Sequence, residues 1–344
     1  MFGNNIDTLV LFSSVNRQYF SKADADFGCV ILHGDEKIYL TDFRYYSYLV
    51  GELKDWNVIK TSVDKMFEKV NAELTRLNAE VVGFEDKIVS VDRFKKLTNA
   101  CSAFKFEPAS NYITQTRAIK TEEEIQKIAS AQMIAQKALG KVVPLVKPGV
   151  TEREVAANIL YEMQMLGAED CAFETSVAFG ENSADPYHKT GKRKLEKGEM
   201  VLIDMGAKLD GYLSDMSRSF CIGSPNEKLE QAHKVVLNAQ EYALANLRAG
   251  ITCHEADSYA REYIISHGFG KEFVHGLGHG VGLDIHEFPH IAYDSPVILQ
   301  PNMIITVEPG VYIEGLGGVR IEDIVVIKED GILNLTNFDK NINL

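Results

Sequence analysis

Short apolar runs alternate with longer helix-like stretches in the first third of the chain. Residues 29–32 and 37–41 are β-forming runs, whereas residues 63–77 have the hydrophobic spacing of a helix. Alternation of strands and helices is typical of a layered sheet-and-helix domain. The first part of the chain is therefore predicted to be a small α/β domain.

From about residue 118 the pattern changes to long helices, each preceded by the signature of a capping box. In this signature a hydroxyl-bearing residue is followed three residues later by Glu, and the two side chains accept hydrogen bonds from free N–H groups at the helix start. Pro225 follows one of these hydroxyls and suits the first helical position. The four pairs are Thr121 with Glu124, Thr151 with Glu154, Ser224 with Glu227, and Thr252 with Glu255.

β-forming runs lie between these helices and predict a mostly antiparallel sheet. They are residues 200–207, 212–222, 303–308 and 319–327. A sheet covered by long helices belongs to the α+β class. The predicted domains are 1–118 and 119–344, since a chain of 344 residues is long enough for two hydrophobic cores.

The composition of the chain argues against nucleic-acid binding and against association with a membrane. With 45% hydrophobic and 25% charged residues the chain can bury a full core, and its net charge of −13 disfavours nucleic acid as a partner. No stretch of about 18 uncharged apolar residues and no leader-like N-terminus stands out, so no membrane association is expected. The five cysteines are odd in number and form no C-x-x-C pair, which predicts reduced thiols in a cytoplasmic protein.

Two aspartates flank a hairpin turn predicted at Asp210-Gly211. With the turn centred there, Asp204 faces Ser217 across the ladder, and Asp215 is its diagonal neighbour on the same face. Asp204 interrupts an apolar run, so its burial needs a compensating cation. A solvated strand edge or a turn-capping role is the alternative for either aspartate taken alone.

Two glutamates occupy comparable positions further along the chain. Glu308 ends the apolar run 303–307, and Glu322 lies within the run 319–326. Each buried acid is costly by itself, so four of them in one domain call for a shared explanation. A bound metal would supply it.

The segment 275–290 holds four of the nine histidines, and glycine stands at every second position around His279. Such glycines permit close backbone approach. A lone histidine is often a packed core residue, but four histidines beside buried acids favour a metal site. Two Asp, two Glu and one His form an oxygen-rich set suited to divalent Mn, Co, Fe or Zn.

Two rival motifs fail on geometry or spacing. Residues 286–290 match H-E-x-x-H, the zinc-protease signature, but Pro289 would break the helix on which that motif depends. The glycine-rich segment lacks G-K-[ST] and fits neither a phosphate loop nor a dinucleotide fingerprint. A nucleotide site is therefore not predicted.

Together these segments resemble the metal-dependent aminopeptidases of the pita-bread fold, and most closely the Xaa-Pro dipeptidases (prolidases) and aminopeptidase P. The resemblance spans the chain, and residues 41–45 (TDFRY) look like a recurring segment of the creatinase-like domain. Five positions match the family's metal ligands in type, order and spacing. The resemblance implies a small creatinase-like N-terminal domain followed by a pita-bread catalytic domain.

The resemblance also implies two divalent metal ions per chain, with manganese preferred over cobalt, zinc or iron. Asp204 would hold one ion, His279 and Glu308 the other, and Asp215 and Glu322 would bridge the two. Such a pair of ions acidifies a water and polarises the scissile carbonyl. Glu308 would also carry a proton from that water to the leaving proline nitrogen.

Further residues match family positions near the substrate. His275 and His286 correspond to histidines that contact the substrate or stabilise the oxyanion, so they join Glu308 as catalytic candidates. Tyr312 and Arg320 correspond to positions near the metals, where a structural role is an equal alternative.

Two departures from the family pattern concern substrate binding. The family histidine that flanks the substrate falls at Tyr187, with His188 one place later, and either side chain could take its part. His290 stands where some prolidases have an arginine for the terminal carboxylate of the dipeptide. An imidazole is a weaker and pH-dependent partner for a carboxylate.

The resemblance thus predicts a metallopeptidase whose substrate is a small peptide with proline at the second position. Xaa-Pro dipeptidase is the first expectation, and aminopeptidase P acting on longer peptides is the alternative. A non-catalytic binding scaffold is disfavoured because all five ligands are present. By the same resemblance we expect a homodimer.

Overall fold

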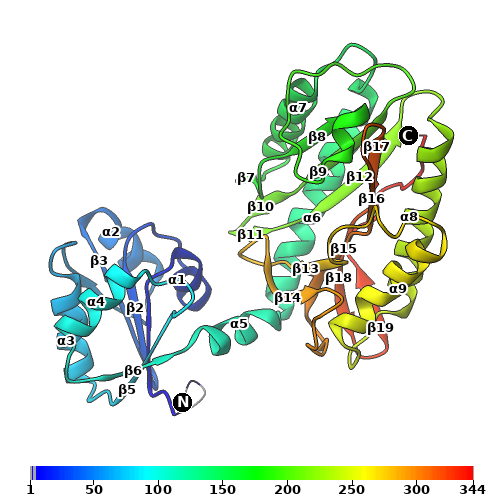
Figure 1. The fold of residues 1–344 in the computed structure, drawn as a ribbon. Coiled ribbons are helices and arrows are strands. Elements are labelled where there is room, and N and C mark those ends of the chain that lie inside the picture. Colours follow the sequence, from blue (N-terminus) through cyan, green and yellow to red (C-terminus); the bar gives the residue numbers. More distant parts are fainter. Residues whose placement is uncertain (1, 3–4, 344) are drawn as a thin grey trace. The chain divides into compact units, whose positions relative to one another are not determined.

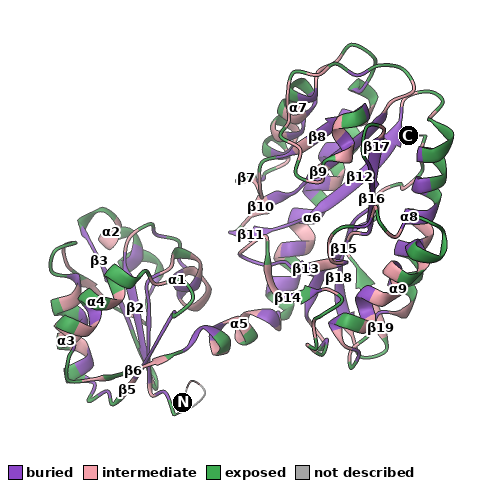
Figure 2. Cartoon of the chain, viewed as in Figure 1, coloured by how far each residue is buried: buried purple, intermediate pink, exposed green. Residues whose placement is uncertain are grey.

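The computed structural model describes residues 2 and 5–343, and the chain divides into two compact units between Arg117 and Ala118. Figure 1 labels most of the helices and strands of both units. The strands carry many of the buried positions, and most helices bury one face only (Figure 2). None of the described helices is both long and apolar enough to cross a bilayer.

The N-terminal unit is built on one mixed sheet with the strand order β4-β3-β2-β1-β5-β6. Alternate residues of a strand face opposite sides of a sheet. In β2, Ile31 accordingly packs with helices α3 and α4, whereas Val30 packs on the other face with α2. The predicted small α/β domain is confirmed. Its elements are β1 Thr8–Leu11, α1 Ser14–Ser21, β2 Cys29–His33, β3 Glu36–Thr41, α2 Phe43–Glu52, β4 Asn57–Lys60, α3 Met66–Arg76, β5 Val81–Phe84, α4 Val91–Ala100, β6 Lys105–Pro108 and α5 Ser110–Ala118.

The second unit has two halves, each with a pair of helices over antiparallel strands (Figure 1). The helices are α6 Glu122–Val142, α7 Glu152–Met165, α8 Glu227–Asn246 and α9 Cys253–Ser266, with 3-10 turns η1 Val143–Leu145 and η2 Gly180–Ala184. The strands of the first half are β7 Asp170–Cys171, β8 Ser176–Phe179, β9 Met200–Met205, β10 Ala207–Leu209, β11 Tyr212–Leu213 and β12 Met216–Cys221. Those of the second half are β13 Gly278–Gly280, β14 Glu287–Ile291, β15 Ile304–Val307, β16 Gly310–Ile313, β17 Gly317–Arg320, β18 Asp323–Lys328 and β19 Gly331–Asn334.

Each helix pair closes its own hydrophobic core. Helices α6 and α7 pack on β8, β9, β10 and β12, while α8 and α9 pack on β15 to β18. Every strand pairing described in this unit is antiparallel. The α+β class is confirmed, although the strands form several small sheets instead of one.

The predicted hairpin forms in the predicted register. Strands β9 and β12 pair Asp204 with Ser217. Asp210 and Gly211 both have positive φ, 51° and 77°, which a two-residue hairpin turn of type I′ requires. The run is broken at Gly206, where a Cβ would overlap the Ser214 carbonyl, so β10 and β11 form a separate ladder with β7.

Two of the four predicted capping boxes are complete, those of Thr121 with Glu124 and Thr151 with Glu154. Thr252 caps α9 through the Glu255 N–H, but the Glu255 carboxylate accepts from the Tyr259 hydroxyl instead. The prediction for Ser224 with Glu227 is wrong. Asn226 is the N-cap of α8 and accepts from the Lys228 N–H at 2.9 Å. Asn and Ser cap equally well, so residue type alone could not separate the two positions.

The run 319–327 is also divided, and this division positions a site residue. β17 pairs with β16, whereas β18 pairs with β15. Glu322 lies at the crossing between the two ladders, and its N–H donates to the Ser217 carbonyl at 3.1 Å. The chain therefore changes partner strands where it presents this carboxylate.

Candidate metal centre

Five side chains from separate strands of the second unit line one pocket of about 510 Å³. Asp204 lies in β9, His279 in β13, and Glu308 directly follows β15. Asp215 and Glu322 lie in the breaks β11–β12 and β17–β18. The structure thus brings all five predicted ligands together, from positions up to 118 residues apart in the chain.

The His279 ring is oriented as a metal ligand needs. Its Nδ1 donates to the Gly280 carbonyl at 3.1 Å, which leaves Nε2 facing the acids. Nε2 lies 3.2 Å from Glu308 Oε1 and 3.7 Å from Asp215 Oδ2. Asp215, His279 and Glu322 can each offer one ligand atom, all within 4.8 Å of one another.

The glycines around His279 allow the close approach that the sequence predicted. A Cβ at Gly278 would overlap the Thr306 carbonyl, and one at Gly280 would overlap the Phe288 carbonyl. The His279 N–H can therefore donate to Thr306 Oγ1 at 2.9 Å, and this hydroxyl donates to Glu308 Oε1 at 3.1 Å. Strand packing thus orients both the imidazole and the carboxylate.

Arg320 is buried beside the acids and makes three hydrogen bonds. Its guanidinium donates to Asp204 Oδ2 at 2.7 Å, to Ser217 Oγ at 2.8 Å and to the Tyr312 hydroxyl at 2.8 Å. Tyr312 OH lies 3.0 Å from His275 Nε2, and His275 Nδ1 donates to the Gly276 carbonyl. Burial lowers the pKa of His275, which keeps this imidazole neutral as an acceptor for the phenol. Tyr312 is 7% exposed and holds Arg320 and His275 together from behind the pocket.

The four carboxyl groups of the site carry more negative charge, when ionised, than the neighbouring basic side chains can balance. Burial raises the pKa values of Asp204, Asp215 and Glu322, and repulsion between the carboxylates adds to the effect. Burial also opposes ionisation of Glu308, but the hydrogen bond from His279 and the charge of that residue outweigh it and lower the Glu308 pKa to about 2. Four carboxyl groups so close together are difficult to ionise without further cations.

Two buried carboxylate oxygens, Asp204 Oδ1 and Glu322 Oε1, have no hydrogen-bond partner among the described residues. A buried oxygen without a partner is rare and usually marks a bound ion or water. An oxygen-rich set with one imidazole is the donor set that divalent first-row metals accept. The residues of this structure therefore fit divalent metal ions.

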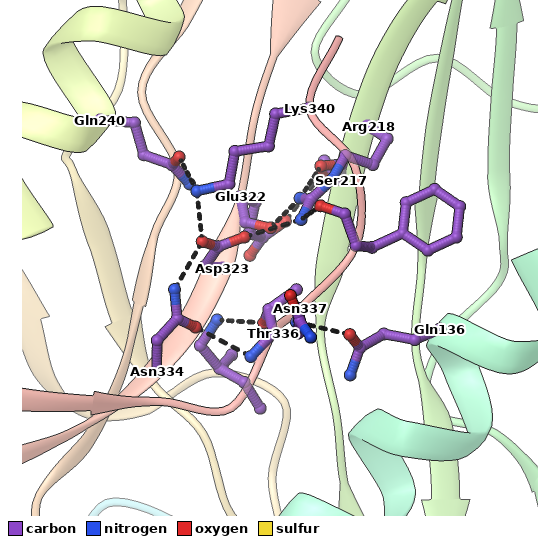
Figure 3. A network of polar contacts seen from close by, with 12 residues as sticks. Gln136, Ser217, Arg218, Gln240, Glu322, Asp323, Asn334, Thr336, Asn337 and Lys340 are labelled. Atoms are coloured by element: carbon purple, nitrogen blue, oxygen red, sulfur yellow. Dashed lines mark hydrogen bonds and ion pairs between the residues drawn. The ribbon is translucent and has the colours of Figure 1, made fainter. Parts of the chain in front are cut away.

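A second polar network holds the strands behind the centre (Figure 3). Arg218, 1% exposed, ion-pairs with Asp323 at 2.8 Å and donates to the Glu322 carbonyl at 2.6 Å. Asp323 Oδ2 also accepts from Lys340 at 2.6 Å and from Asn334 at 2.8 Å. Arg218 is a functional residue that was not predicted from the sequence, although a charged residue inside the apolar run 212–222 is the same signal that identified Asp204.

The remaining predicted site residues line the pocket but differ in exposure and in their contacts with the protein. His286 is exposed and its ring centroid lies 4.3 Å from that of His279. His290 is exposed and faces His279 across the β13–β14 ladder. Tyr187 is 87% exposed at the pocket wall, whereas His188 is tied to Glu152. Residues 287–291 form a strand, so the H-E-x-x-H match is coincidental, as predicted.

The sequence of the chain matches two known protein-family domains. Residues 126–329 match metallopeptidase family M24, and residues 1–119 match the creatinase/prolidase N-terminal domain. The chain belongs to metallopeptidase family M24. It is 39% identical to the Xaa-Pro dipeptidase of Pyrococcus furiosus over 343 residues, which cover 98% of this chain and 96% of that protein. The predicted family, the two-domain fold class and the metallopeptidase class of enzyme are thereby confirmed.

Two solved structures have the same fold as this chain along nearly all of its length. The Xaa-Pro dipeptidase from Bacillus anthracis superposes with a TM-score of 0.95 at 33% identity, covering 98% of this chain and 95% of that one. The X-Pro aminopeptidase from Thermotoga maritima superposes with a TM-score of 0.93 at 35% identity, covering 98% and 97%. The chain is thus similar in fold to a dipeptidase and to an aminopeptidase.

Proposed function

We propose that this M24 peptidase hydrolyses the Xaa-Pro bond of dipeptides. The observation that carries the proposal is the convergence of two Asp, two Glu and one His on a single pocket, in a chain so similar throughout to a Xaa-Pro dipeptidase. Aminopeptidase P activity on longer peptides is the second candidate, favoured by the likeness to the Thermotoga enzyme.

In this proposal the pocket holds two divalent ions, Mn²⁺ before Co²⁺, Zn²⁺ or Fe²⁺. Asp204 would hold one ion, His279 and Glu308 the other, and Asp215 and Glu322 would lie between them. Bound there, divalent ions supply an acidified water and polarise the scissile carbonyl.

Glu308 is the best placed proton carrier among the acids. Its side chain is 16% exposed, whereas that of Asp215 is 7% exposed, so substrate can reach Glu308 from the pocket. Asp204 is also accessible, but its Oδ2 is held by Arg320. The Glu308 carboxylate can accept a proton and return it to the leaving proline nitrogen.

The histidines of the pocket supply the remaining polar contacts with the peptide. His275 and His286 line the wall beside the acids. Both ring nitrogens of His275 are engaged by Gly276 and Tyr312, so His286 is the better placed of the two to donate to the developing oxyanion. His290 is one strand away from His279 and exposed to the pocket, which suits it to the terminal carboxylate of a dipeptide. Arg320 and Tyr312 hold Asp204 and His275 in place.

Hydrolysis of Ala-Pro, Ala-Pro-Ala and Ala-Ala by chelator-stripped protein, with and without Mn²⁺, tests the proposal. Metal-dependent cleavage of Ala-Pro in preference to the other two peptides is the expected result. Preference for Ala-Pro-Ala would establish the aminopeptidase instead. Failure to cleave any of them with Mn²⁺ present would overturn both and favour a binding scaffold.

We also propose that the protein is a homodimer, as the resemblance to prolidases implies. Light scattering at micromolar concentration should give twice the 38.4 kDa chain mass. A monomer mass would contradict the proposal.

A cytoplasmic location is proposed on the state of the cysteines. All five are free thiols, four of them buried. Disulfides are rare where the compartment keeps thiols reduced.

A further inference from the structure

A buried carboxylate outside the metal centre organises one wall of the pocket. Glu152, the first residue of α7, is 0% exposed. Its two oxygens accept four hydrogen bonds, all from the segment 179–191. The donors are the Phe179 N–H (3.0 Å), Asn182 Nδ2 (2.8 Å), His188 Nε2 (3.0 Å) and the Gly191 N–H (2.8 Å). One side chain thus ties both ends and the middle of this segment together.

The ionised form of Glu152 is the one that these donors need. Burial raises its pKa, but hydrogen bonds from Asn182, His188 and the two backbone N–H groups outweigh burial and lower it overall. Gly191 permits the approach, because a Cβ there would meet Glu152 Oε2 at 3.2 Å. The carboxylate is therefore a charged and fully partnered anchor.

Further hydrogen bonds fix the segment against β8. Ser176 Oγ donates to the His188 carbonyl at 3.0 Å, and Thr190 Oγ1 donates to the Thr175 carbonyl at 2.8 Å. The Val177 N–H in turn donates to Thr190 Oγ1 at 2.9 Å. These bonds hold the backbone of residues 188–190, directly after Tyr187, against β8.

Tyr187 and His188 are neighbours with opposite surroundings. The Tyr187 N–H donates to Asp185 Oδ1 at 2.9 Å, but its phenol has no described protein partner and is 87% exposed at the pocket wall. The His188 side chain is 16% exposed, and its Nε2 is engaged by Glu152. The phenol is therefore available to a ligand, while the imidazole is already bound within the protein.

We propose that Glu152 and His188 form a positioning pair that sets the loop, and that Tyr187, not His188, contacts the bound peptide. The proposal deepens the peptidase function proposed above and rests on it. Glu152 and His188 act through Tyr187, so neither needs to touch the substrate.

A double-mutant cycle tests how the three residues are connected. His188→Ala and Tyr187→Ala should each raise KM about tenfold, with a smaller effect on kcat. The double variant should be no worse than the poorer single variant, because the pair acts only through Tyr187. Effects that multiply would mean that His188 contacts the substrate itself and would overturn the proposal, as would an unchanged KM in either single variant.

Conservative and control variants separate positioning from stability. His188→Gln keeps a donor for Glu152 and should restore most of the KM. Glu152→Gln removes the charge and should raise KM and lower Tm together. Glu154→Ala is the matched control, because Glu154 caps the same helix but is exposed and its carboxylate accepts hydrogen bonds from Thr151, not from the segment 179–191. Glu154→Ala should lower Tm and leave KM unchanged. If it raised KM as much as Glu152→Gln does, Glu152 would act only by stabilising the helix.

Limited trypsin digestion tests the loop without any catalysis by the enzyme. Lys189, Lys192, Arg193 and Lys194 provide cleavage sites within or next to the segment. His188→Ala should be cut there several times faster than the parent protein, since cleavage follows local opening. Equal rates would overturn the positioning pair. Faster cutting in a protein that hydrolyses no Xaa-Pro peptide would retain the pair and reject the proposed function.

Discussion

Glu308→Gln is expected to lower kcat by a factor of about 10²–10⁴, the usual contribution of a positioned proton carrier. The amide keeps the shape of the side chain and one acceptor oxygen, but it cannot take up a proton. Ala-Pro hydrolysis with saturating Mn²⁺ measures the effect. Glu314→Gln, at an exposed position between β16 and β17, is the matched control and should retain the activity of the parent enzyme.

Because Glu308 is also a proposed metal ligand, the metal content of the purified variant must be measured beside its kcat. Loss of turnover with two ions still bound would support the proton-transfer role. Near-normal turnover with the metal bound would contradict it. A variant that loses both metal and activity would assign Glu308 to metal binding, and the proton carrier would have to be sought elsewhere.

Arg218→Met is expected to lower the free energy of unfolding by about 3–5 kcal/mol. The substitution removes the guanidinium that pairs with Asp323 Oδ1 and leaves that carboxylate oxygen buried without a cation beside it. Arg218 is 1% exposed and Asp323 is fully buried (Figure 3). The carbonyls of Ser217, Glu322, Phe338 and Asp339 would also lose their donor. For a unit of this size the change corresponds to roughly 6–20 °C in Tm.

Thermal and urea unfolding of chelator-stripped protein would measure this loss without a contribution from metal binding. Lys141→Met is the matched control, because it breaks an exposed ion pair with Glu162 in the same unit. Exposed pairs contribute about 0–1 kcal/mol, so this variant should be close to the parent protein. Equal stability of Arg218→Met and Lys141→Met would refute the role assigned to the buried network.

The features that were predicted correctly depend on neighbours in the chain. The turn at Asp210-Gly211 needs two residues that tolerate positive φ, and this need fixes the pairing of Asp204 with Ser217. The capping boxes at Thr121 and Thr151 also involve only four consecutive residues each. Local steric and hydrogen-bonding rules are sufficient for such features.

The features that were missed depend on distant parts of the chain. The run 319–327 contains no residue that would stop a strand, yet it divides because its two halves pair with different partner strands. Glu152 looks like an ordinary acid in the first turn of a helix. Its burial comes from the segment 179–191, which closes over it with four donors.

The sequence by itself therefore determined the class of this protein: two domains, a hairpin that brings two aspartates together, and a histidine and two glutamates in apolar strands whose burial requires cations. Residue type and spacing are sufficient for this prediction, because an acid inside an apolar strand is costly to bury in any fold unless a cation accompanies it. Only the tertiary structure decided which groups face the pocket. Tyr187 and His188 are equal candidates in the sequence, and they differ because Glu152 lies opposite one ring and not the other.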